Sequence, residues 1–324
     1  MTVINEKLKP YPKLDYSLLP TPVHRLDYLS QEYGVNVYCK RDDLTGFGLG
    51  GNKTRKLDFL LPHALGAGCD TLIAIGANQS NFCRMAAAYG VACAMDVHLV
   101  LGGSAPANPT GNLRLDHMLG VTCHHIDSSD WGEWTDEAKQ VEEKLAAQGR
   151  KVYLMPVGGS TPRGALGYVD AFAEIAADQS RLGVEFDAII HASSSAGTQA
   201  GLVVGQALCG WRGRIVGVSV AKPKTEQEKD VLALARATAT EIGADVNALS
   251  VIVDGDYLGP AYAARTPRCE KAVTLFARKL GIFLDYVYTG KAAAALIDCL
   301  RKGRFTKGTN VLFIHTGGNV ELFE

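Results

Sequence analysis

A lysine directly after a run of glycines is the first residue in the sequence whose setting suggests chemistry. Lys53 follows four glycines in residues 46–51 and stands at the start of a predicted helix over 53–65. Glycines let the backbone approach a ligand closely, and an amine beside them can be held against that ligand. The stretch also satisfies the dinucleotide pattern G-x-G-x-x-G, but the polar turn at 42–45 separates the glycines from a strand, and the lysine would crowd a pyrophosphate. A solvent-exposed glycine turn is the alternative that this stretch alone leaves open.

Two further loops carry small polar residues directly after predicted strands. Ser80 and Asn81 follow the strand at 71–77 and stand at or beside a helix N-terminus, where free N–H groups and the helix dipole favour a carboxylate. Simple helix capping would explain the same two residues. Residues 193–198, SSSAGT, follow the strand at 188–192 in the arrangement that cradles a phosphate, although small residues also permit tight helix-to-sheet packing. The loop lacks the G-K-[ST] of nucleoside triphosphate sites, so a phosphate that anchors a cofactor fits better.

A fourth loop follows the predicted strand at 311–315 and carries the hydroxyl and glycine residues at 316–318. Ligands collect at the carboxyl ends of strands in open α/β sheets, so we expect the four loops to share one crevice. A lysine in a glycine loop, together with a phosphate cradle that lacks triphosphate machinery, suggests a cofactor with one phosphate and an aldehyde. Pyridoxal 5′-phosphate is that cofactor: an amine holds it as a Schiff base, and its ring withdraws electrons from carbanions.

The loops require a scaffold of strands that alternate with helices. Short apolar, β-rich runs recur between helical patterns, several of which begin directly after Gly, Ser or Asn, where helix caps belong. This alternation indicates an α/β fold with mainly parallel sheets. The predicted strands are 71–77, 97–101, 151–157, 188–192, 215–220 and 311–315, and the predicted helices include 53–65, 164–177, 198–209 and 290–300.

Composition and charge narrow the class of protein. The 324 residues are 47% hydrophobic and 21% charged, which is typical of a water-soluble globular protein of one large or two ordinary domains. With 33 Lys and Arg against 34 Asp and Glu, the net charge of −1 gives no basic field for nucleic acid or an anionic membrane. The eight cysteines are scattered, and the sequence shows neither a signal-like start nor a run of roughly 18 apolar residues, so we expect reduced thiols and a cytoplasmic location. His124 and His125 point to opposite faces of a strand, so no metal site is expected there.

Four motifs, in this order, resemble the D-cysteine desulfhydrase and 1-aminocyclopropane-1-carboxylate (ACC) deaminase family. They are GGNKTRK at 50–56, QSN at 79–81, YVYTGK at 286–291 and HTGG at 315–318, and the resemblance spans roughly residues 16 to 324. Four ordered motifs are far more specific than any one of them.

The resemblance implies a fold and a division of the chain. The fold is the tryptophan-synthase-β-like fold type II of pyridoxal-phosphate enzymes, with two open three-layer α/β/α domains and mainly parallel sheets. Residues 1–53 and 165–324 would form a large cofactor-binding domain. Residues 54–164 would form a small domain that closes over the substrate. The family also implies a homodimer.

The resemblance assigns roles to individual residues. Lys53 matches the Schiff-base lysine, Asn81 the residue that hydrogen-bonds the pyridoxal hydroxyl, and Ser80 the residue that lies over the ring near the substrate carboxylate. Tyr288 matches an active-site tyrosine and Tyr262 a second one, although aromatic core packing is the alternative for both. The further cofactor contacts expected are Asn52, Ser195, Ala196, Gly197, Thr198, Thr289 and Thr316, and the expected substrate contacts are Gln79, Ser80, Asn81, Phe82, Tyr262 and Tyr288.

The sequence departs from the family pattern in two places. At the first of them, ACC deaminases have a glutamate, which contacts the pyridine nitrogen. This sequence has Thr289 instead, and the desulfhydrase branch also has a threonine there. A neutral hydroxyl does not enforce a protonated ring, which favours elimination of a good leaving group over cyclopropane opening. Phe82 and Met85 occupy positions that are usually polar, so a group beside the carboxylate site that could influence substrate choice is missing.

These observations predict a pyridoxal-phosphate-dependent lyase that performs α,β-elimination on a small amino acid. D-cysteine, giving pyruvate, sulfide and ammonia, is the first choice of substrate, and L-cysteate or ACC are the alternatives within the family. Two other classes stay open at this stage. A nicotinamide-dependent oxidoreductase would explain the glycine pattern, and a non-catalytic protein that binds pyridoxal phosphate and an amino acid would keep the fold without turnover.

Overall fold

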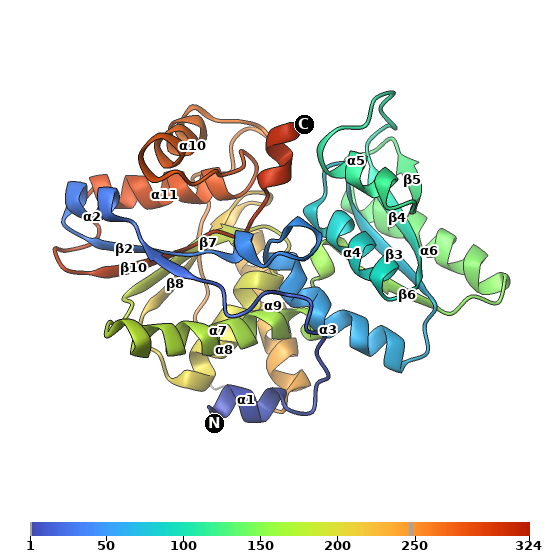
Figure 1. Cartoon of the computed structure of the whole chain (residues 1–324), viewed down its shortest axis with the longest axis horizontal. Helices are drawn as coiled ribbons and strands as arrows, with labels where there is room; N and C mark the ends of the chain where they lie inside the picture. The colour runs from blue at the N-terminus through green and yellow to red at the C-terminus, as the bar shows by residue number, and fades with distance from the viewer. Residues whose placement is uncertain (1, 246–248) are drawn as a thin grey trace.

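The chain folds around two sheets that lie side by side (Figure 1). The computed structural model describes residues 2–245 and 249–324. All strand pairs are parallel except β1 with β2, which confirms the predicted α/β class with mainly parallel sheets. The six-stranded sheet has the order β1 (Val23–Arg25), β2 (Asn36–Lys40), β10 (Asn310–Ile314), β7 (Ala188–Ser193), β8 (Arg214–Ser219) and β9 (Ile252–Asp254). The four-stranded sheet has the order β5 (Thr122–Ile126), β4 (Asp96–Gly102), β3 (Thr71–Ala77) and β6 (Val152–Met155).

Helices cover both faces of the larger sheet, as fold type II requires. Figure 1 shows one group of helices above this sheet and a second group below it. The upper group is α2 (Asp27–Tyr33), α10 (Pro267–Leu280) and α11 (Thr289–Arg301). The lower group is α1 (Val3–Leu8), α7 (Pro162–Leu182), α8 (Gly197–Cys209) and α9 (Lys224–Glu241).

The smaller sheet is also enclosed between helices. On one face, α4 (Asn81–Ala92) and α5 (Gly111–Met118) pack in a core that includes Leu72 and Leu99, and on the other α6 (Trp131–Ala147) packs against Ile73 and Val100. Four short 3-10 helices complete the described structure: η1 (Asp42–Leu44), η2 (Phe47–Leu49), η3 (Val157–Gly159) and η4 (Asn319–Phe323).

The central strands are continuous apolar runs because helices bury both of their faces. In β10, Val311 and Phe313 belong to the core under the upper helices, and Leu312 and Ile314 belong to the core over the lower helices. Successive side chains of a strand point to opposite faces, so an apolar residue is needed at every position. These runs are the strands that the sequence predicts most clearly.

Helix α3 (Asn52–Gly66) starts between the two sheets and contributes to both cores. Phe59 packs with the core over α7 and α8, whereas Leu57 and Leu60 pack with the core of the smaller sheet. All strands of the smaller sheet fall within the predicted small domain at 54–164. The domain boundaries themselves stay a prediction, because the helix that crosses the first of them belongs to both cores.

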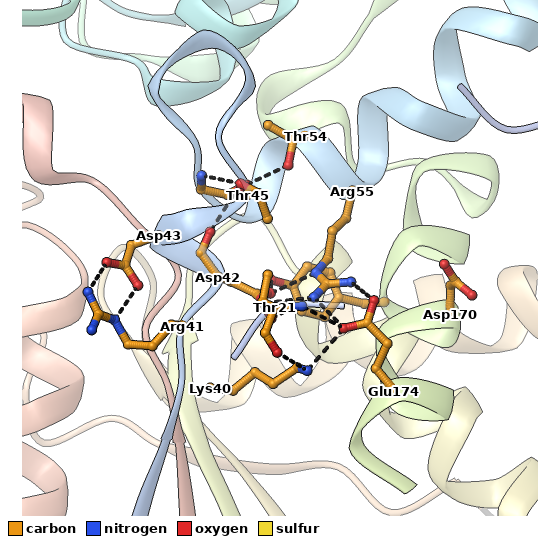
Figure 2. Close-up of polar contacts among 12 residues, drawn as sticks. Thr21, Lys40, Arg41, Asp42, Asp43, Thr45, Thr54, Arg55, Asp170 and Glu174 are labelled. Atoms are coloured by element: carbon orange, nitrogen blue, oxygen red, sulfur yellow. Dashed lines mark hydrogen bonds and ion pairs between the residues drawn. The ribbon is translucent and has the colours of Figure 1, made fainter. Parts of the chain in front are cut away.

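A buried network of ion pairs holds the start of α3 against the larger sheet (Figure 2). The Arg55 guanidinium donates to both carboxylate oxygens of Asp42 at 2.9 and 2.8 Å and to Glu174 at 2.8 Å. Lys40 pairs with Glu174 at 3.0 Å and with Asp178 at 2.7 Å. Because Arg55 lies two residues after Lys53, this network fixes the first turn of the helix that carries the predicted reactive lysine.

Candidate active site

The four predicted loops meet at one cavity of about 780 Å³, part of which opens to solvent. The loops follow β3, β7 and β10 at their carboxyl ends, and the fourth leads into α3. The cavity therefore lies where an open α/β sheet binds ligands. Of the predicted site residues, those that line the cavity are Asn52, Lys53, Ser80, Asn81, Phe82, Ser195, Ala196, Thr198, Tyr262, Tyr288 and Thr316.

Lys53 lies in the first turn of α3, and close backbone contact places it there. The Asn52 N–H donates to the Thr316 carbonyl at 2.9 Å. Gly51 and Gly317, with φ of 118° and 94°, pass so close that a Cβ on Gly317 would lie 2.7 Å from the Gly51 Cα. Only glycine suits both the backbone conformation and this approach. Burial lowers the pKa of Lys53 to about 8, which makes its neutral, nucleophilic form accessible near neutral pH.

Lys56, which the sequence reasoning missed, places a second amine beside the first. Its Nζ donates to the Gly158 carbonyl at 3.0 Å and to Ser160 Oγ at 3.4 Å. No carboxylate pairs with it in the described part of the chain. Burial, and then the neighbouring charge of Lys53, lower the pKa of Lys56 well below its ordinary value. The spacing of three residues on one helix was the available signal, because such residues share a helix face.

The start of α8 provides a cradle for an anion. Ala196, at φ 68°, precedes the helix without a side-chain cap, so the first-turn N–H groups lack intrahelical acceptors. A Cβ on Gly197 would lie 2.5 Å from the Lys56 Nζ, so the amine stands directly beside this backbone. The Asn52 Nδ2 donates to Thr198 Oγ1 at 2.9 Å and links the cradle to α3. Helix N–H groups and a buried amine without a carboxylate partner fit a phosphate, whose negative charge would favour the protonated amine. The aldehyde of pyridoxal phosphate requires an amine such as Lys53.

Ser80 and Asn81 form the N-terminus of α4 at the cavity. Ser80 caps the helix, since its Oγ accepts from the Cys83 N–H at 3.1 Å. The Oδ1 of Asn81 accepts from Asn112 Nδ2 at 3.1 Å and from Arg84 at 3.5 Å, which leaves its NH2 group for another partner. Capping and anion binding are therefore compatible here, because first-turn N–H groups other than that of Cys83 face the cavity end of the helix.

Arg84 and Asn112 join the cavity loops to one another, and no sequence motif indicated either residue. Arg84 Nε donates to Asn112 Oδ1 at 2.6 Å, and its two terminal nitrogens donate to the carbonyls of Gly48 and Gly50. The backbone N–H of Asn112 also donates to Gln79 Oε1 at 2.8 Å. Gln79 is thus tied to the start of α5 rather than to the cavity lining, and its predicted contact with substrate stays a prediction.

Tyr262 and Tyr288 meet in the cavity, where their hydroxyl groups are hydrogen-bonded to each other. Burial raises the pKa of Tyr262 to about 12 and that of Tyr288 well above its ordinary value, so both keep their protons near neutral pH. The carboxylate of Asp285 accepts from the Tyr288 N–H at 2.6 Å and fixes the start of α11. Thr289 donates its hydroxyl to Asp285, is fully buried and does not line the cavity, so its contact with the pyridine nitrogen stays a prediction.

The two residues that depart from the family pattern have different surroundings. Phe82 lines the cavity and is also packed against Gly159, where a Cβ would come within 2.7 Å of its ring. Met85 is fully buried beneath the glycine loop, and a Cβ on Gly51 would lie 3.0 Å from its Cε. Of the two, only Phe82 lies where it can touch a ligand.

Two tryptophans on α6, Trp131 and Trp134, complete the lining and were not predicted. Their ring centroids are 6.2 Å apart, and the Trp131 ring meets the edge of Tyr262 at 6.5 Å. They come from the smaller-sheet part of the chain, whereas Tyr262 and Tyr288 come from the larger-sheet part. A sequence pattern cannot reveal this meeting, because packing between the two parts creates it.

Neither a metal centre nor a membrane span is found in residues 2–245 and 249–324. No three His, Cys, Asp or Glu side chains there are grouped so that they could hold a metal ion. His98 Nδ1 and His124 Nε2 lie 2.9 Å apart, but this pair has no third ligand. No helix in these residues is both long and apolar enough to cross a bilayer.

The fold and a lysine-centred cavity with a phosphate cradle define a pyridoxal-phosphate-dependent enzyme of fold type II. Comparison with protein families agrees with this assignment, because residues 14–317 match the family described as pyridoxal-phosphate dependent enzyme. The chain belongs to this family.

Two relatives with names of their own match nearly the whole chain. D-cysteine desulfhydrase of Yersinia enterocolitica is 39% identical over 328 residues, which cover 99% of this chain and 98% of the relative. A Pyrococcus furiosus protein with the provisional name 1-aminocyclopropane-1-carboxylate deaminase is 38% identical over 315 residues, 97% of this chain and 94% of the relative.

Solved structures support the fold. The crystal structure of an ACC deaminase homologue superimposes with a TM-score of 0.92 at 36% identity and covers 100% of this chain and 97% of that chain. Threonine deaminase of Solanum lycopersicum has a TM-score of 0.71 at 16% identity and covers 98% and 84% of the two chains, so it shares the fold alone.

Proposed function

We propose that this protein is a lyase that performs α,β-elimination on a small β-substituted amino acid, with D-cysteine as the first choice. The main support is the position of Lys53 in a cavity, between a phosphate cradle, a helix N-terminus and two protonated tyrosines. The Yersinia relative named D-cysteine desulfhydrase supports the choice of substrate over the whole chain. The reaction converts D-cysteine and water to pyruvate, hydrogen sulfide and ammonium.

The cofactor would be held by groups already in place. Lys53 is the amine for its aldehyde, and Lys56 and the first-turn N–H groups of α8 are the partners for its phosphate. The NH2 group of Asn81 is the donor for its ring hydroxyl, because Arg84 and Asn112 already occupy the Oδ1 atom. When bound, pyridoxal phosphate supplies an electron sink for negative charge at the substrate Cα.

Three groups of the chain would act on the substrate. The N-terminus of α4 at Ser80 and Asn81 binds the substrate carboxylate through N–H groups and the helix dipole. Lys53 would take up the Cα proton of the substrate, for which a pKa near 8 is well suited. Tyr262 or Tyr288 donates a proton to the departing sulfur, since burial keeps both phenols protonated.

A substrate panel tests this proposal. Holoenzyme is assayed for keto-acid release from D-cysteine, L-cysteine, L-cysteate, D-serine and ACC, with Lys53→Ala as the inactive control. We expect a yellow protein whose cofactor borohydride fixes on Lys53, and the highest turnover with D-cysteine. Turnover of ACC alone would contradict the proposed elimination. A colourless protein that binds a nicotinamide cofactor would overturn the whole assignment, and a yellow protein without any keto-acid release would indicate a binding protein.

We further propose that the enzyme is a cytoplasmic homodimer. Leu18, Leu49 and Phe283 are 67%, 64% and 62% exposed. Contacts bring two of the segments that carry them toward residues 43–45: the Leu18 N–H donates to the Thr45 carbonyl, and His315 contacts the backbones of Asp43 and Phe283. Exposed apolar side chains on neighbouring segments suit a subunit interface. Sedimentation equilibrium would give the mass of two chains, and Leu49→Glu would shift it toward one. Fractionation of the source cells would test the location.

A further inference from the structure

Five aromatic side chains line the active-site cavity: Phe82, Trp131, Trp134, Tyr262 and Tyr288. They come from both parts of the chain, and contacts within the group fix them. The rings of Trp131 and Trp134 stack, and Trp131 and Tyr288 each meet the Tyr262 ring at an angle, with centroids 6.5 and 6.3 Å apart. The cofactor and the substrate carboxylate have their own polar partners, and this aromatic group supplies the largest side chains among the other lining residues.

The two tryptophans are the largest members of the group, and the polar group of Trp134 is already engaged outside the cavity. The indole N–H of Trp134 donates to the Ser128 carbonyl at 2.9 Å. Its ring lies flat against Gly102, where a Cβ would overlap it, so the ring cannot turn. The ammonium of Lys222 lies over the Trp131 ring, 5.4 Å from its centroid. Apart from the N–H of Trp131, the surface that these two rings present to the cavity is therefore apolar and polarisable.

The cavity also lacks a cation for an anionic side chain. Among its lining residues in the described part of the chain, Lys53 is the one charged side chain, and the cofactor engages it. Lys222 is already paired with Asp230 at 2.6 Å and with Glu226 at 3.2 Å. A sulfonate placed against the aromatic group would lose its hydration without gaining a counter-charge, which is costly for any ion.

We propose that this aromatic group selects uncharged sulfur substituents, so that thiols and thioethers of cysteine are substrates and sulfonates are not. The inference rests on the proposed lyase function and specifies its substrate class. The reaction for a thioether is RSCH2CH(NH3+)COO− + H2O → RSH + CH3COCOO− + NH4+, in which the Cβ–S bond breaks and sulfur takes up a proton. Thioether sulfur makes favourable contacts with aromatic rings, and no charge needs to be desolvated.

A pair of substrates that differ mainly in the charge of the substituent tests the proposal. S-methylcysteine and cysteate, each as both enantiomers, are assayed with holoenzyme for pyruvate release. We expect kcat/KM for S-methylcysteine to exceed that for cysteate on the order of tenfold or more, because a buried unpaired anion is strongly disfavoured. Equal or higher kcat/KM with cysteate would overturn the inference while leaving the lyase function intact.

A binding measurement keeps the inference separate from catalysis. If no amino acid released pyruvate, the lyase proposal would fail, but quenching of tryptophan fluorescence in holoenzyme would still rank the two ligands. Tighter binding of S-methylcysteine supports the selection of uncharged substituents, and equal or tighter binding of cysteate contradicts it.

Two substitutions at Trp131 separate charge from shape. Trp131→Arg supplies the missing cation and should reduce the preference for S-methylcysteine over cysteate by about tenfold. Trp131→Leu removes the ring without adding charge and should weaken S-methylcysteine turnover without improving that of cysteate. Yellow colour and an unchanged melting temperature show that each variant is folded. A Leu variant that gains cysteate turnover as much as the Arg variant would contradict the charge argument.

Discussion

Helix α3 carries buried cations of two kinds within a single turn. Arg55 is bonded to Asp42 and Glu174 on the side that faces the larger sheet (Figure 2). Lys53 and Lys56 lie on the cavity side, without a carboxylate partner in the described residues, and burial lowers the pKa of both. In the first group every charge is neutralised within the chain, whereas in the second the amines are left for a ligand.

This difference in pairing helps to distinguish buried charges that stabilise the fold from those that can bind a ligand. A buried cation without a partner destabilises the fold, so its presence needs a reason other than stability. A fully paired network can be explained by the architecture that it holds together. Within helix α3, the pairing of a charge, more than its burial, therefore separates the candidate site from the scaffold.

The largest effect should come from removing the unpaired amine at the centre of the cavity. Lys53→Ala is expected to lower keto-acid release by more than about a thousandfold, because it removes both the cofactor attachment and the proton acceptor. The melting temperature of the cofactor-free variant should not fall, since the lost amine has no carboxylate partner. Steady-state kinetics, borohydride labelling and thermal melting measure the three quantities. A large loss of stability would place Lys53 in the scaffold.

Breaking the paired network should damage stability instead. Asp42→Asn leaves the Arg55 guanidinium partly uncompensated in the interior and is expected to lower the free energy of unfolding by about 3–5 kcal/mol. Asp170→Asn is the matched control: Asp170 pairs with Lys13 at 2.7 Å, but both side chains are partly exposed, so about 1 kcal/mol or less is expected. Urea denaturation compares the two variants. Equal losses would show that burial does not separate these pairs.

The second unpaired amine should matter for the cofactor and little for the fold. Lys56→Met is expected to weaken pyridoxal-phosphate binding about tenfold to a hundredfold, because a charge-assisted hydrogen bond to phosphate is lost. The exposed Lys139 provides the control, since Lys139→Met should change neither affinity nor stability. Titration of the cofactor-free enzyme, followed by absorbance, gives the dissociation constants. Unchanged affinity would remove Lys56 from the phosphate cradle.

The smallest effect concerns an unpaired carboxylate and depends on pH. Both oxygens of Asp116 are buried without a hydrogen-bond partner in the described residues, and burial raises its pKa from 3.8 to about 7. Between these pH values the folded state keeps a proton that the unfolded chain has released, so this residue lowers stability as the pH rises from about 4 to 7. Asp116→Asn should therefore raise the melting temperature more at pH 8 than at pH 5. An equal change at both pH values would show that Asp116 ionises freely.

Much of the fold was predictable, because its signals are local. Apolar runs predicted β3, β7 and β10 within one residue, and small residues at helix starts predicted α3, α8 and α11 within one residue. Short or partly exposed strands such as β1 and β9 were missed. They contribute few buried side chains, so their patterns are weak, and their place at the sheet edges is decided by neighbours that are distant in sequence.

The site was predictable where a motif lies at a strand end and not where two parts of the chain meet. Lys53, Asn81 and Thr198 follow from residues adjacent in sequence. Arg84 bonds to Asn112 twenty-eight positions along the chain, and Trp131 reaches Tyr262 across the cavity. Such contacts arise from tertiary packing, and a single sequence carries no periodicity that reveals them.

The place of β10 in the larger sheet also sets an order of assembly. β10 lies between β2 and β7, although it follows both in the chain, and the Thr316 carbonyl just beyond it anchors Asn52 beside Lys53. During synthesis Lys53 leaves the ribosome long before these residues have been added. Until residue 318 has been added, β2 and β7 have unpaired edges toward each other, and the cavity lacks one of its walls. Lys53 is therefore made early, but the cavity around it is complete only when β10 has joined the sheet.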